Sequence, residues 1–285
     1  MQRLTLTYLL LCLIGGSGLV ASSHAQTRSD LHSERLFAIA SREDKIYKQI
    51  AADPEFYSAA DLERRIDELL RAYSAYLTDN SEDASAWILY GKLLRRVEQY
   101  EQAFQAFLKA DALDPKIAVV KQQLGTHLAE QGKGKAALTF YLHAVELAPQ
   151  TAIYHFALGQ LLYEFRDEFL DDEIFSRDAL DREMLKAFKT AVQLEPDNFD
   201  AQMRLGEAYY DLASPDWKTA LLHWDKLRET VAADQSLRRE IIQLHKARVL
   251  GKLGRGVEAK ELAATILQPS LQRSKQQVLD EIAQH

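Results

Sequence analysis

Between residues 84 and 151, apolar and small side chains recur in one pattern that is written twice, 34 residues apart. The spacing places the side chains of each half-pattern on one helical face, so each copy predicts two helices. Proline closes each copy, because it lacks an N–H group and disfavours helix at the preceding residue. Only Lys121, in the place of Trp87, departs from the pattern. The first copy comprises Trp87, Tyr90, Gly91, Leu94, Ala103, Phe107, Ala110 and Pro115, and the second Leu124, Gly125, Leu128, Ala137, Tyr141, Ala144 and Pro149.

These positions resemble the tetratricopeptide repeat (TPR) family, whose unit of about 34 residues follows the pattern W-x₂-L-G-x₂-Y…A-x₃-F…P. The resemblance implies an all-α, right-handed superhelical solenoid of antiparallel helix pairs. Small residues such as Gly91 and Ala103 let the paired helices approach, and large ones such as Trp87 and Phe107 fill the space beside them. Such repeats are scaffolds for many unrelated partners, so the resemblance specifies fold better than function.

The same register extends outward from the two clear copies and fades toward the ends. Before them, residues 26–42 are polar and expected to be loosely ordered, and helix is predicted from about Glu43 to Ala52 and from Asp61 to Leu77. At the other end, Ser270 is a candidate cap for a last helix. The predicted organisation is a signal peptide at 1–25, an N-terminal helical segment or degenerate repeat at 26–83, repeats at 84–117, 118–151, 152–198 and 199–235, a degenerate fifth repeat at 236–268, and a capping helix at 269–285.

The first 25 residues have the pattern of a secretory signal. Arg3 is followed by an apolar run from Leu4 to Val20, and Ser23-His24-Ala25 has the form of a cleavage site. The alternative is an uncleaved anchor in the inner membrane formed by residues 4–20. The sole cysteine, Cys12, lies inside this run, so cleavage would leave a mature chain without thiol or disulfide chemistry.

Composition and motifs favour a folded, non-enzymatic protein. The chain is 47% hydrophobic and 27% charged, and its net charge of −7 argues against general nucleic-acid binding. No phosphate-binding loop, nucleophile elbow or metalloprotease motif occurs, so we expect no catalytic residues, no cofactor and no bound metal. His127 and His143 are expected on solvated helix surface.

The third repeat carries about 11 extra residues between Phe165 and Arg182. This acidic insertion is expected to form an extended hairpin or an added amphipathic helix with an acidic outer face. A metal site is the alternative, although the order of its acids is not that of a calcium-binding loop. The acids are Asp167, Glu168, Asp171, Asp172, Glu173, Asp178 and Asp181.

In the TPR family, the first helix of each repeat lines a concave groove, and the resemblance implies which side chains face it here. Phe156, Tyr163 and Tyr210 are the expected aromatic anchors, between a basic end and an acidic end. The alternative is an ordinary solvated face with some exposed aromatic rings. The predicted groove residues are Lys92, Arg95, Arg96, Thr126, Phe156, Gln160, Tyr163, Glu164, Met203, Glu207 and Tyr210, with Ile88, Gln122, Glu130 and Asp211 at equivalent places.

Some family members bind a terminal carboxylate through Lys and Asn at places 2 and 6 of successive repeats. That clamp is absent from the first three repeats, where these places hold Ser85, Leu89, Val119, Gln123, Ile153 and Ala157.

Taken together, the sequence predicts an exported scaffold or adaptor, periplasmic or secreted, that binds a protein or peptide partner in its groove and assists assembly of an envelope or secretion complex. The alternative function is a ligand-binding module, with a metal at the acidic insertion or a glycan in the aromatic groove. Calorimetry against calcium and oligosaccharides separates the two, because the scaffold predicts no heat. The partner's identity and the oligomeric state stay open.

Overall fold

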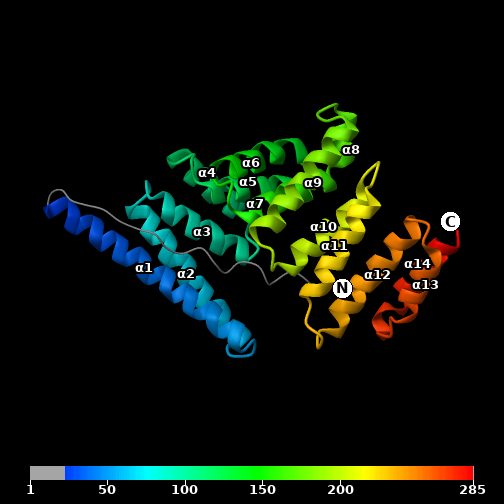
Figure 1. The fold of residues 1–285 in the computed structure, drawn as a ribbon. Coiled ribbons are helices and arrows are strands. Elements are labelled where there is room, and N and C mark those ends of the chain that lie inside the picture. The colour runs from blue at the N-terminus through cyan, green and yellow to red at the C-terminus, as the bar shows by residue number, and fades with distance from the viewer. Residues whose placement is uncertain (1–22, 285) are drawn as a thin grey trace. The chain divides into compact units, whose positions relative to one another are not determined.

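The computed structural model describes residues 23–284, and within that range the chain folds into helices joined by turns, without strands. The predicted signal segment lies largely outside the described residues. The chain divides into two compact units, Met1–Tyr90 and Gly91–His285, here called unit 1 and unit 2. Figure 1 shows the helices following one another as neighbouring pairs, which confirms the predicted all-α solenoid of antiparallel helix pairs.

Unit 1 is built on a hairpin of two helices, α1 (Ser23–Ala52) and α2 (Ala59–Asp79), which Asp53-Pro54 separates as expected. Ser58 caps α2 by accepting a hydrogen bond from the backbone N–H of Asp61 at 3.2 Å. Leu69 and Tyr73 of α2 are fully buried, and the Tyr73 hydroxyl donates to the buried carboxylate of Glu43 at 2.8 Å. The unit ends within α3 (Ala84–Arg96), at Tyr90.

The prediction that residues 26–42 are loosely ordered was wrong, because α1 runs through them without a break. Ile39, Glu43 and Ile46 follow one another at i, i+4 and i+7, and all three are buried. Arg35 also forms an ion pair with Asp79 at 2.9 Å across the hairpin. The polar composition of residues 26–42 concealed Ile39, the first position of a narrow buried stripe that continues through Glu43 to Ile46 and packs against α2.

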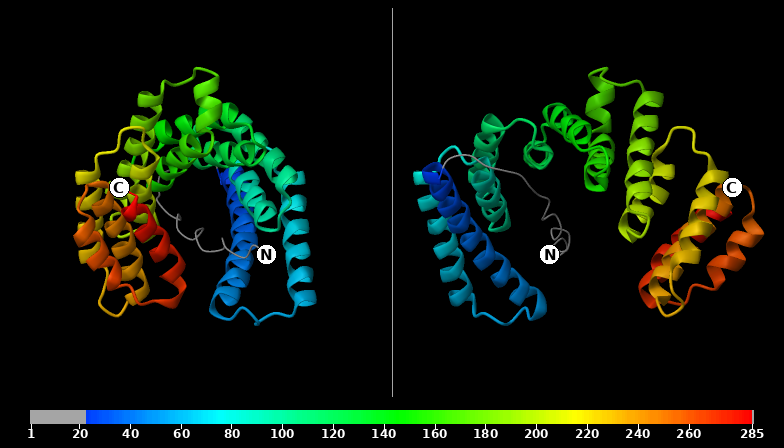
Figure 2. Two further views of the ribbon diagram at one scale, coloured as in Figure 1. Left: turned by 90° about the vertical axis from the view of Figure 1, so that its right-hand side faces the viewer. Right: turned by 60° about the vertical axis from the view of Figure 1, so that its left-hand side comes forward.

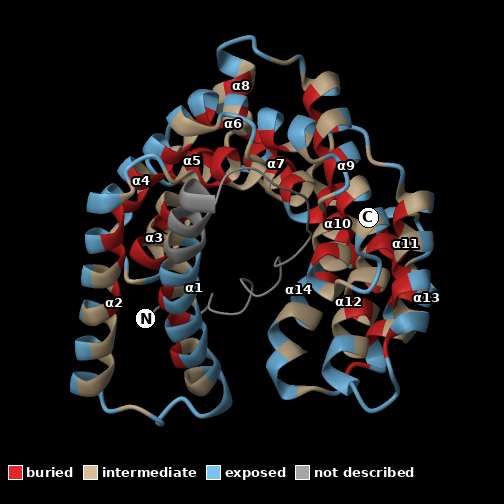
Figure 3. Ribbon diagram, turned by 90° about the vertical axis from the view of Figure 1, so that its left-hand side faces the viewer, coloured by how far each residue is buried: buried red, intermediate tan, exposed pale blue. Residues whose placement is uncertain are grey.

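Unit 2 contains the C-terminal part of α3 and a series of packed helices. Figure 2 shows them following one another in chain order, and Figure 3 shows their buried positions on the sides where neighbouring helices meet. The helices are α4 (Tyr100–Leu113), α5 (Ala118–Glu130), α6 (Gly134–Leu147), α7 (Ala152–Glu164), α8 (Arg166–Asp171), α9 (Arg177–Leu194), α10 (Phe199–Asp211), α11 (Trp217–Thr230), α12 (Ser236–Lys252), α13 (Gly256–Ala264) and α14 (Gln272–Ala283).

One contact recurs within these pairs: an aromatic ring of the second helix packs on a glycine of the first. The ring of Phe107 lies so close to Gly91 that an added Cβ would meet it at 2.9 Å, and a Cβ on Gly206 would overlap the ring of Trp224. Gly159 with Phe188 repeats this arrangement. The glycines are therefore required for close approach, as the repeat pattern predicted. Trp87, by contrast, is only partly buried, and its Nε1 donates to the carbonyl oxygen of Ser81 at 2.8 Å.

Lys121, which replaces the tryptophan of the pattern, is buried without leaving an unpaired charge. Its Nζ lies 2.7 Å from Asp111 Oδ1 on α4 and 5.9 Å from the centre of the Phe140 ring. A buried lysine is tolerated where it has a counterion. The ion pair with Asp111 on the neighbouring helix α4 therefore explains how a lysine can replace the tryptophan of the pattern at position 121.

The acidic insertion forms the short helix α8 and the first turns of α9. Glu168 accepts a hydrogen bond from the backbone N–H of Lys135 at 3.3 Å, and Asp172 pairs with the Lys135 amine at 2.7 Å. Because Lys135 lies in the first turn of α6, these acids stabilise the positive end of that helix. The insertion therefore adds a short helix whose acidic side chains contact the first turn of α6.

The chain ends in α14, whose Val278 and Ile282 are buried against α12 and α13. Ser270 does not cap this helix: a 3₁₀ turn, η1 (Pro269–Leu271), precedes it. Across residues 23–284, no helix combines the length and apolar character needed to cross a bilayer.

Candidate functional site

The predicted groove residues lie on α3, α5, α7 and α10 of unit 2. Side chains from successive first helices meet there: Arg95 of α3 with Glu130 of α5, Gln160 of α7 with Arg204 of α10, and Tyr210 of α10 with His245 of α12. We call this surface, formed by residues 91–96 of α3 and by α5, α7, α10 and α12, the first-helix face. It is the candidate functional site.

The N-terminal part of this face is less basic than predicted. Arg95 forms two hydrogen bonds with the Glu130 carboxylate, of 3.0 and 2.6 Å, and its guanidinium lies 5.6 Å from the Tyr100 ring centre. Arg96 is exposed and Lys92 is half-buried. The bidentate pair neutralises Arg95, so it links two repeats and does not act as an isolated cation.

Thr126 lies at the inner side of the face, in contact with the second helix of its own repeat. Its Oγ1 lies 2.9 Å from the Tyr141 hydroxyl and donates to the Gln122 carbonyl oxygen at 2.9 Å. Burial raises the pKa of Tyr141. The Thr126 hydroxyl therefore forms its hydrogen bonds within the protein, and its proton is not available to donate to a partner.

Tyr163 is the exposed aromatic side chain at the centre of the face, with 40% of its surface accessible. The guanidinium carbon of Arg204 lies 4.3 Å from its ring centre, and that of Arg166 lies 5.2 Å away. Gln160 accepts a 2.7 Å hydrogen bond from Arg204 Nε, while Glu164 is exposed. The two cations hold the tyrosine ring in place and leave part of it open to a partner.

The other two predicted anchors are packed into the protein. Phe156 contacts Phe188 edge to face, with ring centres 5.8 Å apart. Tyr210 stacks on His245 at 5.9 Å and donates its hydroxyl proton to the His245 carbonyl oxygen at 3.2 Å. Met203 is likewise partly buried against the core. Of the three predicted anchors, Tyr163 is the one whose side chain is exposed to solvent, while Phe156 and Tyr210 are partly buried.

The C-terminal part of the face is a mixed-charge cluster, where a purely acidic end was expected. Arg204 pairs with Asp211 at 3.1 Å, and Arg248 pairs with Glu281 of α14 at 3.0 Å. The Glu207 carboxylate interacts electrostatically with both arginines and lies 3.9 Å from His245 Nε2. Burial raises the pKa of Glu207, and the arginines oppose that shift. The acidic charge is therefore largely balanced, with Glu207 as its least paired member.

His245 is the residue of this cluster that responds most to pH. Its ring stacks on Trp224 at 4.5 Å, and burial, reinforced by Arg248, lowers its pKa from an ordinary 6.5 to about 4. The unfolded chain therefore binds a proton between these two values that the folded chain does not. We expect the free energy of unfolding to fall by about 2 kcal/mol between pH 7 and pH 5, and to be constant above pH 7 as far as this group is concerned.

Urea unfolding at several pH values tests this expectation. The variant His245→Gln should lose much less stability on acidification than the unmodified protein. The matched control is His143→Gln, since His143 is exposed on α6 and its removal should leave the acid dependence unchanged. An acid dependence identical in all three proteins would contradict the assignment.

Sequence reasoning missed Arg204, Arg248 and His245. Arg204 occupies place 6 of the fourth repeat and Arg248 occupies place 13 of the fifth, counted from Phe199 and Ser236. Extending the groove places to the fifth repeat would have found Arg248, whereas place 6, which Arg204 occupies, is not one of the groove places. His245 has no signal of its own in the sequence, because its role follows from stacking on Trp224.

Metal ligation finds no support in the part of the chain that the structure describes. Residues 23–284 contain no group of three or more His, Cys, Asp or Glu side chains arranged to hold an ion. His127 was expected on solvated surface, but it is buried and stacks on Phe104 at 4.2 Å, so burial lowers its pKa. That prediction was wrong because the neighbouring repeat covers the histidine.

Comparison with known proteins gives three results. Residues 84–117 match the profile of the tetratricopeptide repeat family. Among solved structures, pilF of Pseudomonas aeruginosa has a TM-score of 0.58 at 14% identity, over 89% of this chain and 98% of that one. MamA of Desulfovibrio magneticus RS-1 has a TM-score of 0.46 at 24% identity, over 65% and 93% of the two chains. A search of curated proteins finds no match. The pilF likeness shows the fold and nothing further.

Proposed function

Because this chain is a tetratricopeptide repeat protein, we propose that it is an exported, non-enzymatic scaffold whose first-helix face binds a protein or peptide partner. The observation that carries the proposal is the surface around Tyr163. An exposed aromatic ring is fixed there by Arg204 and Arg166, with the exposed Glu164 beside it. Rigid aromatic side chains in a polar surround are typical centres of binding energy at protein interfaces.

The charges around this centre favour a partner with basic side chains. Glu164 is exposed, and the ion-pair contact of Glu207 is with the ring of His245, at 3.9 Å, while Arg204 and Arg248, which also act on its charge, are paired with Asp211 and Glu281. His245 is neutral at physiological pH, so it offers Glu207 no full counterion. A lysine or arginine of the partner would supply that charge and could lie along the Tyr163 ring.

Export and a role in assembling an envelope or secretion complex complete the proposal. The support for export is the sequence of residues 1–25, and repeat stacks present long binding surfaces suited to assembly. The metal-binding alternative is not favoured, since Asp172 and Glu168 of the insertion are engaged with α6.

Photo-crosslinking in intact cells tests the proposal. A photoreactive phenylalanine analogue is placed at Tyr163 and, as matched controls, at Leu142 of α6 and Leu222 of α11, which are also exposed. We expect an adduct from position 163 but not from the controls, and its loss when Glu164 and Glu207 are both changed to Gln. N-terminal sequencing of the same purified protein should begin at Gln26.

Two outcomes oppose the proposal. Adducts from positions 142 and 222 alone would move the binding surface to the second helices. A purified protein that retains residues 1–25 and sediments with membranes would replace export by membrane anchoring.

A further inference from the structure

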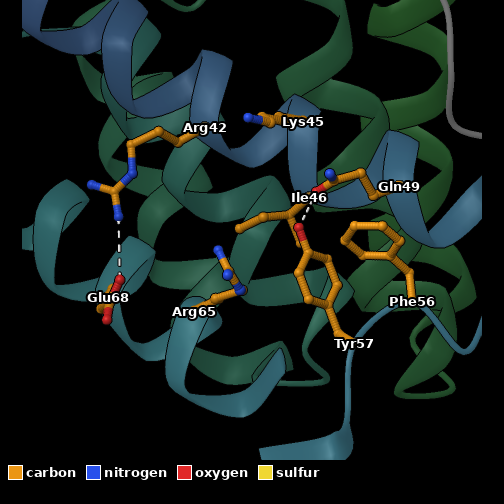
Figure 4. A pocket seen from close by; sticks show the side chains of 8 residues that line it. All are labelled: Arg42, Lys45, Ile46, Gln49, Phe56, Tyr57, Arg65 and Glu68. Carbon is orange, nitrogen blue, oxygen red and sulfur yellow. Dashed lines mark hydrogen bonds and ion pairs between the residues drawn. The ribbon is translucent and has the colours of Figure 1, made fainter. Parts of the chain in front are cut away.

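Unit 1 contains a recess that the proposed function does not use. It lies between α1 and α2 beside the loop that joins them, and its volume is about 360 Å³. Figure 4 shows its side chains converging from both helices and the loop. The recess, here called the α1–α2 pocket, is lined by Arg42, Lys45, Ile46, Gln49, Phe56, Tyr57, Arg65 and Glu68.

One wall of the pocket is apolar and held in position. Phe56 packs edge to face on Tyr57 with ring centres 4.8 Å apart, while 51% of Phe56 stays exposed. The Tyr57 hydroxyl donates a hydrogen bond to the Gln49 side chain, and the buried Ile46 lies beside them. A half-exposed phenylalanine on a fixed ring is an open apolar contact surface within the recess.

The opposite wall carries more positive than negative charge. Arg42 has one 3.5 Å contact with Glu68, and Glu68 is shared with Arg64 at 2.7 Å. Asp61 is likewise shared between Arg64 and Arg65.

Lys45 has no ion pair among the residues that the structure describes. Together with Arg42, Arg64 and Arg65, it makes four cations around two carboxylates, an excess of two positive charges in a chain of net charge −7.

Arg65 joins the two walls. Its guanidinium carbon lies 4.6 Å from the Tyr57 ring centre, and its Nε donates to Asp61 at 2.9 Å. The guanidinium is thereby fixed at the border between the aromatic surface and the cations. An anion bound beside it would lie within reach of Arg42 and Lys45 and next to the rings (Figure 4).

We propose that the α1–α2 pocket binds an acidic peptide segment in which a carboxylate side chain stands next to an apolar one. Guanidinium groups match the geometry of carboxylates, and the Phe56–Tyr57 wall accepts the apolar neighbour. The volume lies at the low end of ligand sites, roughly 300–1,000 Å³, which suits one or two side chains. A phosphate ion would satisfy the cations but would leave the aromatic wall unused.

This site goes beyond the proposed function, because it is formed by residues of unit 1 and binds a ligand of the opposite charge. The first-helix face favours a basic partner segment, whereas the α1–α2 pocket favours an acidic one. Failure of either experiment leaves the other proposal standing, since the two sets of residues do not overlap.

Isothermal titration of the purified chain with the peptide acetyl-Leu-Asp-Phe-Glu-amide tests the pocket. The variant Arg42→Gln with Lys45→Gln should bind roughly tenfold or more weakly, because it loses charge-assisted hydrogen bonds. Lys48→Gln with Arg71→Gln is the matched control, since these side chains lie on the same helices outside the pocket and should not alter binding. Phe56→Ser should also weaken binding, through the apolar wall.

The inference is overturned by any of three results. The acidic peptide does not bind, or binds the Arg42/Lys45 variant equally well. The amide peptide acetyl-Leu-Asn-Phe-Gln-amide binds as tightly as the acidic one. Inorganic phosphate binds as tightly as the peptide with the same loss in the variant, which would make this a simple anion site.

Discussion

Replacement of Trp224 by alanine is expected to lower the free energy of unfolding by about 3–5 kcal/mol, the range for a buried large aromatic side chain. Trp224 is fully buried, its ring lies against Gly206, and it stacks on His245 at 4.5 Å. Alanine would leave a cavity at the junction of α10, α11 and α12, because the glycine backbone opposite has no side chain with which to fill it. Urea unfolding followed by circular dichroism measures the loss.

The control for Trp224 lies two residues earlier on the same helix. Leu222 is 60% exposed, so Leu222→Ala should change the unfolding free energy by no more than about 0.5 kcal/mol. Equal losses in the two variants would show that the effect reflects the helix as a whole and not the packing of the ring on Gly206.

Replacement of Arg204 by methionine is expected to cost about 3 kcal/mol, the lower end of the range for breaking a buried ion pair. The Arg204 and Asp211 side chains are only 12% and 19% exposed. Methionine has an apolar chain that can pack on Tyr163 and Phe188, but it loses the cation–π contacts with both rings. It also leaves the Asp211 carboxylate without its counterion and removes the hydrogen bond to Gln160. The same urea titration measures this loss.

A second substitution separates charge from packing. Adding Asp211→Asn to Arg204→Met should restore most of the lost stability, because a neutral amide is less costly to bury than an unpaired carboxylate. The exposed pair Arg182–Glu183 is the control, and Arg182→Met should cost less than about 1 kcal/mol. If the double variant is as unstable as Arg204→Met alone, packing and not charge maintains this part of the face.

The first-helix face and the α1–α2 pocket share one feature but differ in the sign of their charge. The first-helix face has a fixed tyrosine beside underpaired acids, and the α1–α2 pocket has exposed phenylalanine beside underpaired bases. Each therefore combines an apolar contact with a charge that a partner would complete, which is how interfaces gain both affinity and specificity. A partner with basic and acidic segments would satisfy both.

The repeat fold could be predicted from the spacing of residues along the chain. Gly91, Phe107 and Pro115 recur with their counterparts at a fixed interval, and each acts through local geometry: close approach, filling and helix termination. Such effects depend on neighbours within one helix pair, so spacing alone reveals them. The close contacts of Gly159 with Phe188 and of Gly206 with Trp224 follow the same logic in the degenerate copies.

Which polar side chains are available to a partner depends on packing between helices, and the spacing of residues does not predict it. Arg95 was predicted as a groove residue at a basic end, and it is paired with Glu130, 35 positions later in the chain. His127 is covered by Phe104, and Ile39 and Ile46 make residues 26–42 part of a long helix once α2 lies beside them. These outcomes depend on contacts between elements distant in sequence. Periodicity records which face a residue occupies, but not which charge or ring the next helix places opposite it.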